Sequence, residues 1–181
     1  MPHKIGYAIL LDDNSHNYAR QMELDLSQRF NTRGGLRQSP HITIKVPFSA
    51  EELGPFVAYF DQIAKETEPF NIVLTGVDYF EPNVIFINVE KNQKLQDFHE
   101  RIITDLKKNY GVEPNLKVEG ENVRFHSSLA VSDLTEENFH KAKEYLKNEN
   151  PYFNFNATTL ALFYHLSSEE GWIIYKRTKL E

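Results

Sequence analysis

Two short segments, each with a histidine two residues before a hydroxyl, constrain this chain more than any other feature. The first is His41-Ile-Thr43 and the second is His126-Ser-Ser128, 85 positions further on. Side chains of a β-strand alternate between its two faces, so in each segment the histidine and the hydroxyl share a face. We therefore expect a fold in which two similar strands occupy equivalent positions in two related halves.

The same offset relates other features of the two halves. The pair Phe70-Asn71 recurs as Phe155-Asn156, and the order strand, helix, loop, histidine strand, helix and strand occurs twice. This repetition predicts one bilobal α+β domain over residues 1–181, with repeats over about 1–83 and 84–181. Two antiparallel sheets would face each other across a central cleft, with helices outside and a pseudo-twofold axis. A strand crossover could exchange the lobe boundaries.

Hydrophobic periodicity locates the individual elements. Helices are predicted over 18–30, 53–64, 95–106 and about 135–147, with Ser49-x-x-Glu52 and Asp133-x-x-Glu136 as caps of the second and fourth. Strands are predicted over 5–11, 70–80, 84–89, 153–165 and 172–178, in addition to the two histidine segments. The pattern leaves open whether 84–89 belongs to the first sheet or the second.

Charge and composition exclude several classes of function. With 26 acidic and 20 basic residues the formal charge is −6, which argues against non-specific coating of nucleic acid. The absence of cysteine excludes disulfides, thiolate catalysis and cysteine-based metal sites. No run approaches the roughly 18 apolar residues of a membrane helix, and the apolar run 5–11 is too short for a signal peptide. We therefore expect a cytoplasmic monomer without membrane contact.

A single histidine–hydroxyl triplet is weak evidence, because such triplets arise by chance. The chain has a third one, His165-Leu-Ser167, which has no partner at the 85-residue offset. For an isolated strand histidine, hydrogen bonding to neighbouring backbone is the simpler interpretation. For His41 and His126, the repeat-related position, the strand context, the same-face hydroxyl and a preceding irregular loop together favour catalysis.

Two facing histidines suit the cleavage of a phosphodiester or cyclic phosphate. In-line displacement needs a base for the attacking oxygen and an acid for the leaving oxygen. Imidazoles supply both near neutral pH, since their ordinary pKa is about 6.5. Thr43 and Ser128, about 6.6 Å further along their strands, can donate to the non-bridging oxygens. This scheme requires neither a metal nor a cofactor.

Paired His-x-Thr/Ser strands in a duplicated α+β chain resemble the 2H phosphoesterase superfamily, in particular its 2′-5′ RNA ligase-like members. The resemblance covers nearly the whole chain, including the hairpin around 83–89 and the closing segment Trp172-Ile-Ile-Tyr175. It implies a bilobal fold with a central cleft. It also implies action on 2′,3′-cyclic phosphates or 2′-5′ linked nucleotides or RNA ends, with reversible ligation as an additional activity.

By that resemblance His41 and His126 would be acid and base, and Thr43 and Ser128 would hold the phosphate. The second segment departs from the family pattern in two ways. Ser127 stands where the family usually has an apolar residue, and the hydroxyl of Ser128 comes from serine instead of threonine.

Four further residues are candidates for substrate binding. Lys45 and Arg124 share faces with the two histidines and could bind phosphate. Tyr7 and Phe86, each in the strand that opens its repeat, could stack a base. The simpler alternatives are a solvent-exposed lysine, a surface salt bridge and core packing.

Two other functions remain open at this point. One is a non-catalytic RNA- or nucleotide-binding module, in which aromatic side chains and a basic pocket hold the ligand. A metallohydrolase is less well supported, because no carboxylate near the histidines completes a ligand set. Arg33 and Arg37, in the loop before His41, could close on a substrate or simply face solvent.

Overall fold

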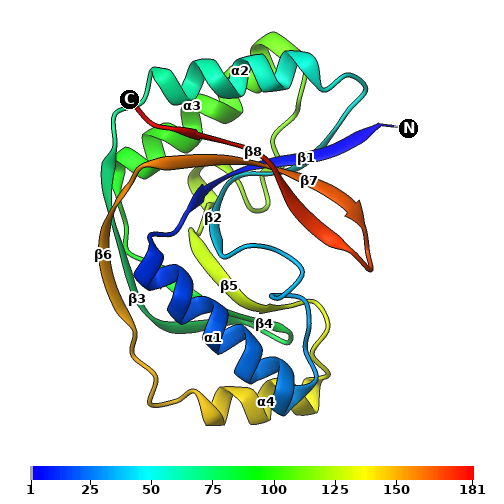
Figure 1. Cartoon of the computed structure of the whole chain (residues 1–181), viewed down its shortest axis with the longest axis vertical. Helices are drawn as coiled ribbons and strands as arrows, with labels where there is room; N and C mark the ends of the chain where they lie inside the picture. The colour runs from blue at the N-terminus through cyan, green and yellow to red at the C-terminus, as the bar shows by residue number, and fades with distance from the viewer. Residues whose placement is uncertain (1) are drawn as a thin grey trace.

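The computed structural model describes residues 2–181, whose strands form two four-stranded antiparallel sheets (Figure 1). In spatial order the first sheet contains β2 (His41–Ala50), β1 (His3–Leu10), β7 (Thr159–Ser167) and β8 (Gly171–Lys179). The second contains β5 (His126–Val131), β4 (Val84–Val89), β3 (Phe70–Phe80) and β6 (Tyr152–Ala157). The predicted α+β fold with two antiparallel sheets is confirmed.

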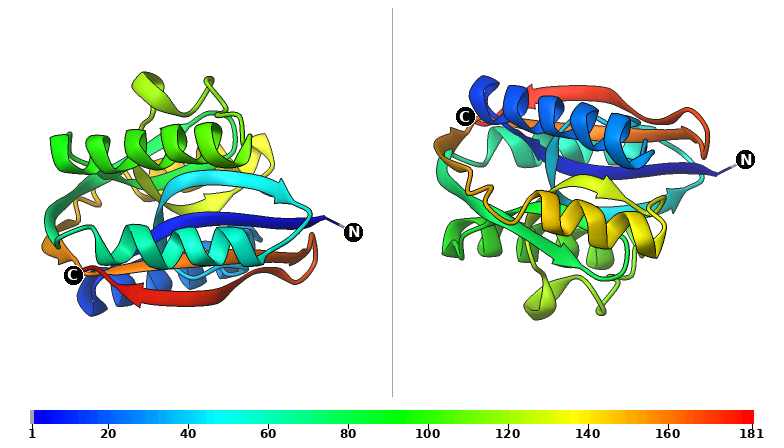
Figure 2. Two further views of the ribbon diagram at one scale, coloured as in Figure 1. Left: turned by 90° about the horizontal axis from the view of Figure 1, so that it is seen from above. Right: turned by 90° about the horizontal axis from the view of Figure 1, so that it is seen from below.

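Four α-helices pack outside the sheets, as the periodicity predicts. They are α1 (Asp13–Phe30), α2 (Gly54–Lys65), α3 (Gln93–Tyr110) and α4 (Glu136–Tyr145), and a 3₁₀ turn, η1, covers Gly120–Asn122. Figures 1 and 2 show α2 and α3 at one end of the molecule and α1 and α4 at the other. The Tyr59 hydroxyl donates to Asp105 across the first pair, at 3.0 Å. None of the helices in the described residues has the length and hydropathy of a membrane span.

The two halves of the chain exchange elements. Strand β3, from the first half, lies in the second sheet between β4 and β6, while β7 and β8, from the second half, complete the first sheet. Helix α1 packs against β5 and α3 packs against β2. Each histidine strand is the outermost strand of its own sheet, and β2 contacts β5. The exchange therefore brings the two histidine strands together at the centre.

The segment predicted as one strand over 153–165 is two strands in different sheets, so that expectation is corrected. Strand β6 pairs with β3, with Asn156 opposite Asn71, and β7 pairs with β1, with Ala161 opposite Ala8. The chain leaves the second sheet and enters the first around Thr158 (Figure 1). Both parts bury apolar side chains, so the apolar pattern continues across the change of sheet.

The two predicted caps are also corrected. Ser49 lies in β2, opposite Lys4 of β1, and α2 begins with Leu53 as its N-cap and no side-chain hydrogen bond at that cap. Helix α4 is capped by Thr135, whose side chain accepts from the Asn138 amide. Strand pairing extends β2 beyond the expected boundary, which removes Ser49 from the start of the helix.

The loop that leads to His41 is held by elements of both halves. Arg20 of α1 donates to the carbonyl of Gln38, at 2.7 Å, and Asp133 accepts from the Arg33 amide, also at 2.7 Å. Gly35 lies so close to β5 that a Cβ atom would be 2.3 Å from the Leu129 carbonyl oxygen. Glycine at this position therefore allows the loop to approach the second histidine strand.

Gly35→Ala is expected to lower the free energy of unfolding by about 1–3 kcal/mol, because backbone atoms must move to admit the methyl group. Gly54→Ala is the matched control, since no atom lies within 4 Å of a Cβ there. Alanine is expected to be neutral or stabilising at that position, by up to about 1 kcal/mol. Urea denaturation measures both changes, and equal stabilities of the two variants would contradict the close approach.

Candidate active site

The two imidazole rings are held in the same way. Nδ1 of His41 is 2.7 Å from the Ser39 carbonyl oxygen, and Nδ1 of His126 is 2.7 Å from the Arg124 carbonyl oxygen. A carbonyl oxygen can only accept, so Nδ1 carries the proton and donates in both rings. In the neutral rings Nε2 therefore presents a lone pair. For His41 that atom lies 3.2 Å from the Thr43 hydroxyl, which donates to it.

The four residues of the paired triplets line two adjoining hollows. His41, Thr43 and Ser128 line one of about 200 Å³. His126, Thr43 and Ser128 line the other, of about 410 Å³. Because Thr43 and Ser128 belong to both, the hydroxyls lie between the histidines. The tertiary structure thus gathers residues that are 85 positions apart in the sequence.

Burial governs the ionisation of both histidines. The pKa of His41 is lowered to about 4, mainly because the ring is removed from water; the hydrogen bond to the Ser39 carbonyl opposes the shift, and His126 adds to it. Burial also lowers the pKa of His126; the Arg124 carbonyl opposes this, and the Arg124 guanidinium adds to it. Both rings are therefore neutral at pH 7 in the free protein.

Aromatic rings fix the orientation of both imidazoles. The ring of His41 packs on Phe163, with centroids 4.5 Å apart. The ring of His126 lies 4.8 Å from Phe86 and 5.1 Å from Phe80. Phe86 is fully buried beneath this ring. The expectation that Phe86 stacks a base is therefore corrected: its ring supports an imidazole.

Tyr7 is among the residues that line the hollow beside His41, but its ring packs against α2, which corrects the second base-stacking expectation. Its side chain is 0% exposed, and its hydroxyl donates to the Phe56 carbonyl, at 2.9 Å. The ring packs against Tyr59 and Phe60 of α2. The alternation of side chains along the sequence predicts that Tyr7 lies in a strand, but it does not predict which face of that strand a helix covers.

Lys45 is not a free cation beside the histidines, so the phosphate-binding expectation for it is corrected. It is 1% exposed, and its Nζ lies 2.8 Å and 3.0 Å from the two carboxylate oxygens of Glu119. The β1–β2 register is irregular here: Tyr7 faces Lys45 and Ala8 faces Thr43, with Ile44 extra. Such a bulge redirects the next side chain, which is why alternation from His41 fails at Lys45.

Glu119 anchors the loop between α3 and β5 to this bulge. Besides Lys45, it accepts from the amides of Val46, at 3.0 Å, and Asn115, at 2.7 Å. His99, also fully buried, donates through Nδ1 to the Ile44 carbonyl, at 2.6 Å. Sequence reasoning missed both residues, because a glutamate in an irregular loop and a histidine on a helix carry no pattern that reveals a distant partner.

Arg124 lies beside the second histidine but is already engaged. It forms an ion pair with Asp78 and donates to Asn88, at 3.4 Å. Its guanidinium also lies 5.0 Å from the centroid of the Phe86 ring. The side chain is 44% exposed, so a phosphate can still approach it. Phosphate binding by Arg124 remains a prediction.

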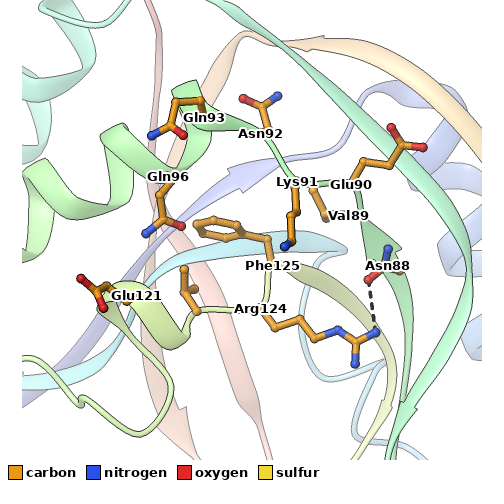
Figure 3. A pocket seen from close by; sticks show the side chains of 11 residues that line it. Asn88, Val89, Glu90, Lys91, Asn92, Gln93, Gln96, Glu121, Arg124 and Phe125 are labelled. Carbon is orange, nitrogen blue, oxygen red and sulfur yellow. Dashed lines mark hydrogen bonds between the residues drawn. The ribbon is translucent and has the colours of Figure 1, made fainter.

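A hollow of about 680 Å³, larger than the two beside the histidines, lies beyond Arg124 and is lined by neither catalytic candidate. Figure 3 shows its lining, in which Lys91, Gln96 and Arg124 are among the polar side chains and Arg124 is hydrogen-bonded to Asn88. Gln96 lines it from α3 and donates to the Gly120 carbonyl, at 3.1 Å. Size alone therefore does not identify the site of chemistry.

The third triplet has local partners, as its lack of a repeat partner suggested. The His165 ring packs against Trp172, with centroids 4.8 Å apart, and the Ser167 hydroxyl accepts from the Glu170 amide, at 3.0 Å. Within residues 2–181, no three His, Asp or Glu side chains gather as they would around a metal ion.

The fold and the site together define a class of bilobal α+β proteins. In this class the outermost strands of two antiparallel sheets meet, and each carries a histidine–hydroxyl triplet. Residues 11–169 match the family model of the 2′-5′ RNA ligase superfamily. The chain therefore belongs to this family, and the resemblance to 2H phosphoesterases is confirmed.

Sequence relatives carry phosphoesterase names. "Putative phosphoesterase OB1230" of Oceanobacillus iheyensis is 42% identical over 81 residues, which are 42% of this chain and 47% of that protein. "Putative phosphoesterase GWCH70_0799" of Geobacillus sp. strain WCH70 is 26% identical over 144 residues, 76% of each chain. The matched part spans less than half the length of the first of these two relatives.

Solved structures share the fold over nearly the whole chain. The crystal structure of TT0787 of Thermus thermophilus has a TM-score of 0.61 at 15% identity, covering 98% of this chain and 97% of that one. Escherichia coli LigT in apo form has a TM-score of 0.61 at 12% identity, covering 99% and 98%. LigT has also been crystallised with 3′-AMP, and that structure has a TM-score of 0.58 at 13% identity, covering 99% and 98%.

Glu119→Ala is expected to lower the free energy of unfolding by about 3–5 kcal/mol, because it leaves the Lys45 ammonium buried without its counter-charge. Glu137→Ala is the control: it removes an ion pair with Lys141 whose side chains are 76% and 59% exposed. That change is expected to have a much smaller effect on stability, because water screens exposed charges. Similar losses for both variants in urea denaturation would contradict the anchoring role of Glu119.

Proposed function

We propose that this protein is a metal-independent phosphodiesterase that acts on 2′,3′-cyclic phosphates or on 2′-5′ linked nucleotides and RNA ends. The observation that carries the proposal is the pair of imidazoles whose Nδ1 atoms donate to backbone carbonyls, so that Nε2 of each neutral ring has a lone pair for proton transfer. Membership of the 2′-5′ RNA ligase superfamily supports the same chemistry. The crystal structure of LigT with 3′-AMP supports a nucleotide ligand.

In the proposed reaction one neutral histidine accepts a proton from water through Nε2 as the water oxygen attacks phosphorus. The other, protonated histidine gives its Nε2 proton to the departing ribose oxygen. One P–O bond forms, one breaks, and the dyad ends with the proton on the opposite ring. If a ribose hydroxyl takes the place of the attacking water, its oxygen forms the new P–O bond, one ring P–O bond of the cyclic phosphate breaks, and a nucleotide linkage results.

Thr43 and Ser128 donate to the non-bridging oxygens of the phosphate as negative charge increases there. In the free protein the Thr43 hydroxyl donates to Nε2 of His41 instead. A bound phosphate offers a stronger acceptor, so this hydroxyl can turn to the anion and free the imidazole nitrogen. The anion also raises the pKa of both histidines, because a nearby negative charge favours the protonated ring.

His41→Ala and His126→Ala are each expected to lower kcat for a 2′,3′-cyclic nucleotide by roughly 10²- to 10⁴-fold, because each removes one proton-transfer group. His140→Ala, on the outer face of α4 and 62% exposed, is the control and should retain the wild-type rate. The assay is run with and without EDTA. Wild-type rates in either dyad variant would refute the proposal, and nucleotide binding without turnover would favour a non-catalytic binding module.

The pH dependence of kcat/KM should be bell-shaped, with its maximum below about pH 6.5, the ordinary pKa of an imidazole. This parameter reports the free enzyme, in which one ring must be protonated and the other neutral. Activity falls at low pH as His41, with its pKa lowered to about 4, gains a proton. Activity falls at higher pH as His126 loses its proton. Burial lowers the pKa of this ring as well. A maximum at or above about pH 7.5 would contradict the assignment of this pair.

A further inference from the structure

Trp172 is the only tryptophan of the chain, and it lines the same hollow as His41 and Thr43. The side chain is half-buried at the start of β8. Gln38 and Phe163 line this hollow as well. None of the roles described so far for the paired triplets involves the indole.

The backbone around Trp172 is fastened to the loop that leads to His41. The Trp172 amide donates to the Arg37 carbonyl, at 2.9 Å, and the Arg37 guanidinium donates to the Ser168 carbonyl, at 3.2 Å. Gly171 has a φ of 82°, and a Cβ there would lie 2.3 Å from the Arg37 carbonyl oxygen. Arg37 thus joins the β7–β8 hairpin to the histidine loop, which holds the start of β8 beside the loop that leads to His41.

Space beside the indole comes from small residues of β1. Gly6 and Ala8 line the same hollow, and Ala8 packs in a small apolar cluster with Phe163 and Trp172. Lys4, also on β1, has its Nζ 5.8 Å from the centroid of the indole. The hollow therefore combines a flat aromatic wall, an apolar floor and the amide of Gln38.

The hollow on the His126 side differs in chemistry. Its apolar lining is largely aliphatic, from Val46, Pro47, Val84, Val118 and Val123. The aromatic ring that also lines it, Phe80, already packs against Phe86 and His126. On the His41 side Trp172 lines the hollow, and its own ring partner is His165, which does not line it.

We infer that Trp172 is the stacking platform for the nucleobase of the substrate, on the His41 side of the dyad. This inference rests on the proposed function, which provides a nucleotide whose phosphate lies between Thr43 and Ser128. Aromatic rings bind bases of any sequence through their π-faces, and the loss of one such ring weakens binding by roughly 5- to 150-fold. Gln38 offers the donor and acceptor needed at the edge of the base.

The single tryptophan provides a direct measurement. Titration with 3′-AMP is expected to quench the emission of Trp172, while titration with inorganic phosphate, which lacks a base, is expected to leave the emission nearly unchanged. Equal responses to both probes, or no response to 3′-AMP at concentrations that calorimetry shows to be saturating, would overturn the inference.

Calorimetric measurement of 3′-AMP and phosphate binding by variants provides the second test. Trp172→Ala should weaken 3′-AMP binding by roughly 5- to 150-fold and leave phosphate binding unchanged, and Trp172→Phe should retain most of the affinity. Tyr175→Ala, a 51% exposed aromatic on the same strand, is the control. If Val118→Glu weakens 3′-AMP binding and Trp172→Ala does not, the base lies on the His126 side and the inference fails.

The outcomes separate this inference from the proposed function. If Trp172→Ala hydrolyses a 2′,3′-cyclic nucleotide with wild-type kcat/KM, the platform is wrong while the histidine chemistry stands. If 3′-AMP binds against Trp172 but the wild-type protein hydrolyses no cyclic nucleotide, the proposed reaction is wrong while the platform stands.

Discussion

The contact between β2 and β5 is the constraint on which the remaining structure depends. These strands belong to different sheets, and each is the outermost strand of its sheet. They come together because β3 pairs with β4 and β6 of the second half, and because β7 pairs with β1 of the first. Backbone hydrogen bonds of the exchanged strands thus hold each half against the other, and the two histidine–hydroxyl segments lie at the junction.

At this junction the two histidines are held alike but differ in their surroundings. Both donate through Nδ1 to a carbonyl two residues upstream, which fixes the tautomer, and Nε2 of His41 accepts from the Thr43 hydroxyl. Burial is the main cause of the lowered pKa in both rings. Outside the dyad the repeat symmetry ends: an indole and the Arg37 loop flank His41, whereas Arg124 and an aliphatic hollow flank His126.

Both histidine strands have a bulge at the same place in the repeat, with Ile44 extra in β2 and Leu129 extra in β5. In β2 the bulge directs Lys45 into the interior, where the Glu119 carboxylate neutralises it, and it lets His99 bond to the Ile44 carbonyl. A buried ion pair of this kind contributes little to net stability, yet removal of one partner is costly. The pair therefore joins the loop that lines the His126 side to the strand that carries His41.

The sequence alone was sufficient to predict the duplicated α+β architecture, the four helices and the β3–β4 hairpin, since these follow from local periodicity and from the 85-residue offset. It also singled out His41 and His126 with their hydroxyls. It could not predict which half supplies each strand, the faces of Tyr7 and Phe86, the partner of Lys45 or the position of Trp172. Those features depend on strand exchange and on a bulge, which arise from contacts between residues far apart in the chain, whereas periodicity records only neighbours.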